Sequence, residues 1–404
     1  MHFKKSLIFA ITSVMLIGCG SSPSASATAS SSSSSSSSGD PDSRTFDELL
    51  ESGKKNGNKL TVYSTASVTV TACSAFQKQY NLDDIEFDCQ QIGDTDQITR
   101  VATEEQSGAE GADVIFIQDG ARVVSELVDP GYVYNWYNKQ ILDLVGDRAE
   151  PMLPWVYDNK VIIFNSNNVT KDDIKNIWAL TDEKFKGSFQ MKDPTVEGVN
   201  MDFLVELTND ENSEKLATAY KDYFGNDIKL DSDCPNAGYQ FIKNLYQNGA
   251  VLGTSDGDIA EAIGDQSQTQ PWIALITLNK FKKNLDKGLA LDYTSDVEPF
   301  AGFIYPIYAL QTKNADNPDL AKAFTYWLLT QQGWDGSEQT IDLGDDGIYK
   351  GMSGRFGDYS SNTSIAVADG DQDLASWEKS LVSCDPNWDA EHRADVEDFI
   401  STIK

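Results

Sequence analysis

Polar side chains in short loops after predicted strands are the residues of this chain best placed to bind a ligand. The first loop, STAS, contains Ser64, Thr65 and Ser67 between a predicted strand and a predicted helix. Hydroxyl groups and unpaired backbone N–H groups at a helix start favour a polar or anionic group. N-capping of the helix is the alternative role for these residues, and one residue can do both.

Acidic residues form a second group of candidates. Asp119 directly follows a predicted buried strand, where its carboxylate would suit an amine or a sugar hydroxyl. Asp256, within TSDGD, is either a cap of the next helix or a ligand contact. The strand-to-helix turn DPTVEGVN adds four candidates: Thr195, Glu197, Gly198 and Asn200. The glycine would let the backbone approach a ligand closely.

Aromatic residues near the same loops could stack on a sugar or hold a cationic amine. The candidates are Trp155, Tyr157, Trp272 and Tyr305. Packing in the core or at a hinge is the alternative for each of them.

The elements that must position these loops alternate between strands and helices. NKLTVYST, IEFDCQQI and ADVIFI have strand patterns, and the segments between them have helical spacing. This βαβαβ order requires a parallel sheet covered by helices, with ligands beyond the carboxyl ends of the strands. We therefore expect loops 64–67, 93–96 and 118–120 along one edge of a crevice.

The rest of the chain predicts a second unit of the same kind. The chain has 404 residues, which is enough for two lobes of ordinary domain size. We expect lobe 1 over residues 43–162 and lobe 2 over 163–298. A return to lobe 1 is expected over 299–404, with terminal helices packed on that lobe.

The N-terminal region predicts export and membrane anchoring. Residues 1–18 have a positive start and an apolar stretch too short to span a membrane. LIGC at 16–19 resembles the lipobox of bacterial lipoproteins, which implies that Cys19 is acylated. Residues 19–42 are rich in serine, so we expect a flexible tether. The folded part would stand at the outer face of the cytoplasmic membrane, or on the periplasmic side in a host with an outer membrane.

Charge and cysteines narrow the class of protein further. The net charge of −31 repels nucleic acid and anionic lipid, so neither is expected as a partner. Four cysteines follow the candidate anchor. We expect a disulfide between Cys73, in a predicted helix, and Cys89, in the next strand, and a second between Cys234 and Cys384. Free thiols are the alternative.

Several segments, in order, resemble the extracellular solute-binding proteins of ABC importers, in the branch of ferric-ion-binding proteins. They run from LTVYST through VIIFNSNNVTKDDI and FKGSFQMKDPTVEG to KNADNPDLAKAFTYWLL. The resemblance implies a two-lobed α/β fold of the type II periplasmic binding proteins, with a mostly parallel sheet in each lobe and hinge strands between them. It also implies a monomer without catalytic residues or a cofactor, which hands a small polar solute to an ABC permease in the membrane.

The sequence departs from this family where iron would bind. Ferric-ion-binding members carry two adjacent tyrosines after a strand of the second lobe, and the matching positions fall near Leu278 and Asn279, beside Lys280. The only histidines are His2 and His392, so no metal site is expected. An organic or oxyanion solute is expected rather than iron, and a ferric-ion receptor is the alternative.

Two other classes of function stay open. A secreted hydrolase would need a pair of carboxylates, since the chain has no H-E-x-x-H motif and no histidine in its body for a catalytic triad. A surface sensor would use the binding fold without transport. Permease and ATPase genes beside this gene would favour import over sensing.

Overall fold

The computed structural model describes residues 41–331 and 354–403. The expected signal segment 1–18, the candidate lipid anchor Cys19 and residues 19–40 of the expected tether lie outside these ranges. Within them, no helix combines the length and the apolar content that a bilayer crossing needs.

The strands form one sheet in the order β2-β1-β3-β10-β5-β8-β6-β7, with β4 and β12 also paired to β10, and β9 and β11 to β5. At one end β2, β1 and β3 are parallel, and at the other end β8, β6 and β7 are parallel. We call the parts built on these two ends lobe 1 and lobe 2. The strands are β1 (Lys59–Ser64), β2 (Glu86–Gln91), β3 (Val114–Ile117), β4 (Val133–Asn135), β5 (Pro154–Asn165), β6 (Phe189–Lys192), β7 (Val251–Gly253), β8 (Ile273–Thr277), β9 (Leu291–Thr294), β10 (Gly302–Thr312), β11 (Asp358–Ser360) and β12 (Val382–Ser383).

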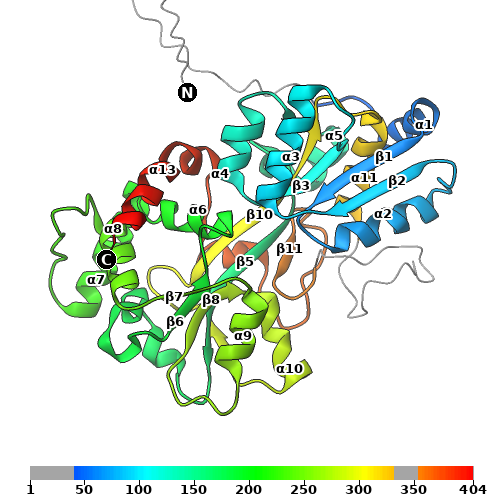
Figure 1. Cartoon of the computed structure of the whole chain (residues 1–404). Coiled ribbons are helices and arrows are strands. Elements are labelled where there is room, and N and C mark those ends of the chain that lie inside the picture. Colours follow the sequence, from blue (N-terminus) through cyan, green and yellow to red (C-terminus); the bar gives the residue numbers. More distant parts are fainter. Residues whose placement is uncertain (1–40, 332–353, 404) are drawn as a thin grey trace, which may run out of the picture. The chain divides into compact units, whose positions relative to one another are not determined.

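Two long antiparallel strands connect the lobes. The first part of β5 pairs with the first part of β10. The second part of β10 pairs with β3 of lobe 1, and the second part of β5 pairs with β8 of lobe 2. Nearly every residue of both strands is buried. The expected mostly parallel sheets with hinge strands between them are therefore confirmed, and Figure 1 shows β5 and β10 running through the centre of the fold.

Helices cover both ends of the sheet. They are α1 (Phe46–Asn56), α2 (Val68–Gln79), α3 (Asp94–Ser107), α4 (Gly120–Val123), α5 (Lys139–Val145), α6 (Gly198–Glu206), α7 (Asp210–Phe224), α8 (Ala237–Gln247), α9 (Asp256–Gly264), α10 (Lys283–Lys287), α11 (Pro318–Thr330), α12 (Leu374–Trp377) and α13 (Pro386–Thr402). A π turn, η1 (Val124–Val128), and five 3-10 turns complete the described elements. These turns are η2 (Gly146–Ala149), η3 (Lys171–Ile174), η4 (Ile177–Thr181), η5 (Glu183–Phe185) and η6 (Leu278–Lys282).

Aromatic side chains build much of the lobe 1 core. Phe324 and Trp327, on the apolar face of α11, pack on Phe76 of α2. Phe116 of β3 meets Trp155 of β5 edge to face, with ring centroids 5.4 Å apart. These side chains are buried, so they stabilise the sheet from which the loops of lobe 1 project.

The C-terminal helix α13 contacts both lobes. It packs on α4 of lobe 1 and on α6 and α8 of lobe 2, and Figure 1 shows it lying between these helices. On α13, Arg393 donates through Nη1 to Asp119 at 2.7 Å and to Asp202 of α6 at 3.2 Å. The terminal helix α13 thus packs on lobe 1 as expected, but the expectation was incomplete, because α13 also packs on lobe 2.

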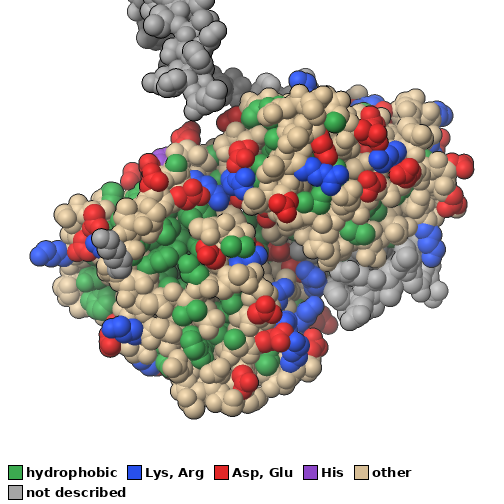
Figure 2. All heavy atoms as spheres, viewed as in Figure 1, with side chains coloured by type: hydrophobic (Ala, Val, Ile, Leu, Met, Phe, Trp, Pro, Cys, Tyr) green, Lys and Arg blue, Asp and Glu red, His purple; other side chains and the backbone are tan. Residues whose placement is uncertain are grey.

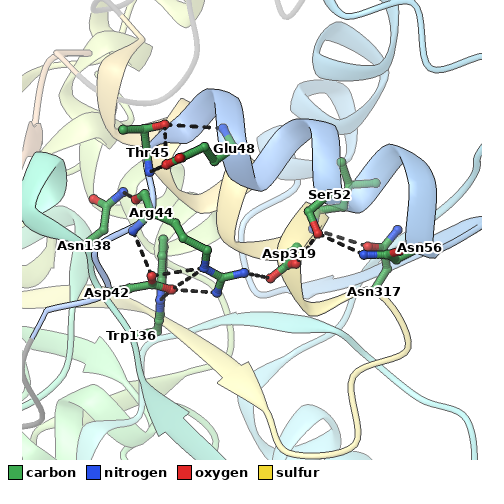
Figure 3. A network of polar contacts seen from close by, with 11 residues as sticks. Asp42, Arg44, Thr45, Glu48, Ser52, Asn56, Trp136, Asn138, Asn317 and Asp319 are labelled. Atoms are coloured by element: carbon green, nitrogen blue, oxygen red, sulfur yellow. Dashed lines mark hydrogen bonds and ion pairs between the residues drawn. The ribbon is translucent and has the colours of Figure 1, made fainter.

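The first described residues are fixed to lobe 1 and α11 by charge. Arg44 forms an ion pair with Asp42 at 2.7 Å and another with Asp319 of α11 at 2.6 Å. Asp42 also accepts a hydrogen bond from Trp136 Nε1 at 3.2 Å, and Figure 3 shows this network beside α1. Asp42 therefore belongs to the folded part, and the expected tether cannot extend to it. The pKa of Asp42 lies far below its usual range because of the hydrogen bond from Arg44.

Candidate ligand-binding site

A cavity of about 450 Å³ lies where the loops of both lobes meet the hinge strands. Its wall consists of Thr65, Ala66, Ser67, Val68, Gln91 and Gln118 from lobe 1, Lys192, Glu197, Thr254, Ser255, Asp256, Gly257, Thr277, Asn279 and Lys280 from lobe 2, and Asp158, Tyr305 and Arg355 from β5, β10 and the turn before β11. The volume is in the usual range for small-molecule sites. Figure 2 shows a hollow near the centre of this face, with both acidic and basic side chains beside it.

The loop between β1 and α2 provides the lobe 1 wall. Thr65 and Ser67 line the cavity, as the STAS motif predicts. Ser67 is the N-cap residue of α2, but its side chain makes no capping hydrogen bond. Ser64 is buried instead: its hydroxyl bonds Thr69 Oγ1 at 2.8 Å and accepts from Ala66 N at 3.1 Å. It shapes the loop from inside and is not among the residues that line the cavity, which corrects its expected role.

A buried lysine organises the lobe 2 wall. Lys160, on β5, is fully buried and forms ion pairs with Glu197 and, at 3.2 Å, with Asp256. Glu197 is also paired with Lys192 at 3.2 Å. Asp256 begins α9 next to the N-cap residue Ser255. Both predicted acids therefore line the cavity, and each is neutralised by a lysine.

A pair of carboxyl groups lies at the hinge side of the cavity. Asp158 of β5 stands opposite Asp358 of β11 in the sheet, and both are buried. Burial, followed by the neighbouring Asp358, raises the pKa of Asp158 well above its usual range. Asp358 is bound by Arg355 and accepts from Asn279 Nδ2 at 3.2 Å. Burial and the neighbouring carboxyl therefore favour the protonated form of Asp158, and the guanidinium of Arg355 lies beside Asp358.

Tyr305 and Lys280 are the other ionisable groups of the wall. Tyr305 of β10 lines the cavity as predicted, and burial raises its pKa well above the usual value. Its phenol is therefore neutral at pH 7. Burial lowers the pKa of Lys280, which follows β8 in η6. No ion pair or hydrogen bond of this ammonium exists within residues 41–331 and 354–403.

Asp119 does not line the cavity. Its carboxylate accepts from the backbone N–H of Arg122 at 3.3 Å, which caps α4, and it forms the ion pair with Arg393. A side-chain Cβ built at Gly198 would lie 1.8 Å from Asp119 Oδ2. The glycine therefore lets α6 approach this carboxylate, and not a ligand. The expected roles of Asp119 and Gly198 as ligand contacts are wrong, because both serve the contact between α4 and α6.

Two more residues of the DPTVEGVN turn have structural roles. Thr195 is exposed and bonds Asp193 Oδ1 at 2.8 Å through its hydroxyl. Asn200 is buried and donates from Nδ2 to the backbone oxygen of Lys192 at 2.6 Å. Both hold the turn in place, so their expected ligand contacts are corrected.

Three of the four aromatic candidates lie outside the cavity. Trp155 is a core residue that packs on Phe116, and Trp272 donates to Gln268 Oε1 at 3.1 Å beside the lobe 2 core. Tyr157 lines a different cavity, of about 260 Å³, together with Arg148. Burial raises the pKa of Tyr157 to about 12. Packing is therefore the role of the two tryptophans.

Sequence reasoning missed most of the charged residues in and behind the wall. The stretch WVYDNKVIIF places Asp158 and Lys160 inside an otherwise apolar strand. Buried charges are rare unless they are paired, so this stretch was a usable signal. Asn279 and Lys280 were identified only as replacements of the tyrosine pair, and both line the cavity. Arg355 lies in a glycine-rich segment that gave no signal of a site.

The cysteines follow one of the two expected pairings. Cys73 of α2 and Cys89 of β2 form a disulfide, with Cα atoms 6.6 Å apart. Cys234 and Cys384 are free, so the second expected pairing is wrong. They lie on separate elements: Cys234 precedes α8, and Cys384 precedes α13 and lines the same cavity as Tyr157.

One group of metal-ligating atom types is found in the described part of the chain. Asp231, Asp233 and Cys234 bring one ligand atom each within 4.8 Å of one another. Lys243 occupies this place, at 2.9 Å from Asp231 and 2.7 Å from Asp233. Burial raises the pKa of Cys234 to about 11, so the thiol is protonated. The group is an ion-pair cluster.

Solved structures show where this fold occurs. Iron-bound HitA from Pseudomonas aeruginosa aligns with a TM-score of 0.62 at 16% identity, over 85% of this chain and 99% of that chain. The ferric binding protein from Campylobacter jejuni aligns with a TM-score of 0.60 at 16% identity, over 85% and 99% of the two chains. AfuA from Actinobacillus pleuropneumoniae, with exogenous fructose-6-phosphate bound, aligns with a TM-score of 0.57 at 15% identity, over 85% and 98%.

The fold is that of the type II periplasmic binding proteins. AfuA is described as a periplasmic binding protein, and another neighbour, from Agrobacterium tumefaciens, as the substrate binding protein of an ABC transporter. The sequence matches no family model and no curated protein sequence. The cavity described above is lined by loops of both lobes and by residues of the hinge strands.

Proposed function

We propose that this protein is the lipid-anchored, solute-binding receptor of an ABC importer. It captures a small polar solute between its lobes as a monomer and delivers it to the permease in the membrane, without chemistry of its own. The observation that carries the proposal is the cavity of about 450 Å³, whose wall includes loops of both lobes and residues of both hinge strands. A ligand there favours the closed arrangement because it contacts both lobes at once.

The fold neighbours support this kind of function. HitA is described with iron and AfuA with fructose-6-phosphate, so the same fold holds solutes of very different chemistry. Sequence identities of 14–16% support the same fold, but they do not identify the solute. The solute of this chain must therefore be inferred from its own cavity.

The described wall favours an organic or oxyanion solute over ferric ion. Fe(III) prefers anionic oxygen ligands, chiefly carboxylate and phenolate. Glu197 and Asp256 are each held by a lysine, and the phenol of Tyr305 is neutral. Lys280 adds a positive charge to the same wall. A cation would have to displace these lysines before it could bind.

Membrane anchoring belongs to the same proposal and rests on the sequence. Acylation at Cys19 would keep the receptor close to its permease. Replacement of Cys19 by alanine should release the protein from the membrane fraction into the soluble fraction, and the change is measured by immunoblotting. Unchanged membrane association would remove the anchor from the proposal.

Two measurements test the function. Native mass spectrometry of the protein purified from its own host should find a small molecule bound with one-to-one stoichiometry. Thermal shift against metals, oxyanions, amines and sugars should find one class that raises the melting temperature, because a ligand of the folded state stabilises it. A melting-temperature shift with ferric ion alone would favour iron as the solute over an organic compound. Turnover of a bound compound would contradict the receptor proposal and favour an enzyme.

A further inference from the structure

One cation of the cavity wall has no ion-pair partner among the described residues. Lys192 is paired with Glu197, and Arg355 is paired with Asp358. Lys280 lines the same cavity, but within the part of the chain that the structure describes its ammonium makes no ion pair or hydrogen bond. Burial disfavours its charged form. Within the described residues, this partly desolvated ammonium therefore makes no ion pair.

Asp256, Asp358 and Asp158 lie near enough to Lys280 to favour its charged form, but none of these described acids forms an ion pair with it. Glu197 and Asp256 are both bound to the buried Lys160, and a second lysine also holds Glu197. Asp158 and Asp358 face each other in the sheet, and burial raises the pKa of Asp158. The guanidinium of Arg355 is bound to Asp358. Among the described residues of the wall, Lys280 is therefore the cation that has no ion-pair partner.

The rest of the wall offers uncharged hydrogen-bonding groups. Thr65, Ser67 and Gln91 stand on the lobe 1 side, and Thr254 on the lobe 2 side. Gln118 also lines the cavity, and its amide lies 3.5 Å from an oxygen of Asp158. Hydroxyl and amide groups of this kind donate to and accept from sugar-like hydroxyls.

We propose that the solute is a small hydroxylated compound with one oxyanion group, a carboxylate or a phosphate monoester, and that the oxyanion binds Lys280. This proposal rests on the proposed function and names the class of solute. The oxyanion supplies the ion-pair partner that Lys280 lacks among the described residues, and the hydroxyl groups of the solute bind the uncharged part of the wall. Lys280 is thus the residue that selects an acid over the neutral compound of the same shape.

Matched probes separate charge from shape. The full-length protein is titrated by calorimetry with glucose, glucuronate and glucose 6-phosphate, and with glycerol, glycerate and glycerol 3-phosphate. At least one acid should bind more tightly than its neutral parent. Comparing the carboxylate with the phosphate in each set identifies which oxyanion the cavity prefers. Equal or tighter binding of the neutral parent, or no binding of any acid, overturns the proposal.

Variants of Lys280 test whether this side chain causes the preference for the acid over its neutral parent. Lys280→Gln should weaken binding of the acid about 10- to 100-fold, since hydrogen bonds to charged groups contribute ~1.5–3 kcal/mol. It should weaken binding of the neutral parent less than binding of the acid. Lys280→Arg should retain most of the affinity. Lys287→Gln is the matched control, because Lys287 lies on α10 outside the cavity wall, is paired with Glu261, and its loss changes the net charge equally.

The outcomes distinguish this proposal from the function on which it rests. A neutral or cationic solute found by native mass spectrometry overturns the oxyanion and leaves the receptor function intact. The absence of any bound solute, together with the absence of binding in the panel, contradicts both. If Lys280→Gln and Lys287→Gln bind an acid with equal affinity, Lys280 does not bind the oxyanion. The melting temperature of each unliganded variant shows whether it is folded.

Discussion

Replacement of Arg393 by methionine tests whether α13 holds the two lobes together. Arg393 Nη1 lies 2.7 Å from Asp119 of lobe 1 and 3.2 Å from Asp202 of lobe 2. The exposed fractions of the three side chains are 13%, 2% and 3%. Methionine keeps most of the apolar volume and removes the charge. The variant therefore leaves two buried carboxyl groups without their shared cation.

The expected loss of stability follows from the burial of these three side chains. Removing one partner from a buried ion pair costs about 3–5 kcal/mol. The compact unit runs from Asp40 to Lys404, which is about 365 residues, and unfolding entropy is ~2.1 cal/mol/K per residue. The entropy of unfolding is then about 0.8 kcal/mol/K. We expect the melting temperature of Arg393→Met to fall by about 4–7 °C at pH 8, measured by scanning calorimetry.

The pKa shifts of the two carboxyl groups predict at which pH the variant loses more stability. Burial raises the pKa of Asp119 and of Asp202. A carboxyl whose pKa is higher in the folded state stabilises the fold below its unfolded pKa of about 4, and this stabilisation is lost as pH rises through the folded pKa. Without the guanidinium both values should rise further. The deficit of the variant should therefore be largest at pH 8 and smaller at pH 5.

Controls isolate the buried ion pairs. Arg122→Met removes an arginine on α4 that pairs with Glu126 at the surface, and it should cost about 0.5 kcal/mol or less. Combining Arg393→Met with Asp202→Asn should recover part of the loss, because one uncompensated carboxyl is then gone. Equal melting temperatures for Arg393→Met and Arg122→Met at both pH values, or a larger deficit at pH 5, would refute the reasoning.

Three further predictions concern the lobe 1 wall and the contact between α4 and α6. Thr65→Ala should weaken solute binding, measured by calorimetric titration, with little change in melting temperature. Ser64→Ala should instead lower the free energy of unfolding by about 1 kcal/mol, because buried hydrogen bonds are lost, and this change is measured by melting. Gly198→Ala should destabilise the fold, since its Cβ would overlap the carboxylate of Asp119; an unchanged melting temperature contradicts this. Cys73→Ser should lower the free energy of unfolding by about 3 kcal/mol for a loop of 16 residues, measured against the oxidised parent protein.

Much of the fold could be predicted because its signals are local. The alternation in NKLTVYST and the apolar run ADVIFI each identify a strand from a few neighbouring residues. The place of α13 could not be predicted in this way. Arg393 and Asp119 are 274 residues apart, and no periodicity within α13 says which lobe its faces contact. The two-lobed fold was therefore accessible from the sequence, whereas the packing of its C-terminal helix was not.

The site was predictable only where a loop follows a strand. Thr65 and Asp256 were found because each stands at a helix start beyond a strand, where ligands bind in sheets of this kind. Asp158 was missed because it lies within a strand, and its role depends on Asp358, which is 200 residues away. Trp155 was placed at the site by its residue type, although packing against Phe116 decides its position.

The disulfide between α2 and β2 has a consequence for binding. Ser67 and Val68 stand at the start of α2, and Gln91 ends β2, so both crosslinked elements contribute to the cavity wall. A covalent tie between them limits how far this side of the cavity can deform before a ligand arrives, which lowers the entropy lost on binding. The affinity of this cavity for a ligand should thus be lower in the reduced protein than in the oxidised protein, although neither cysteine lines the cavity.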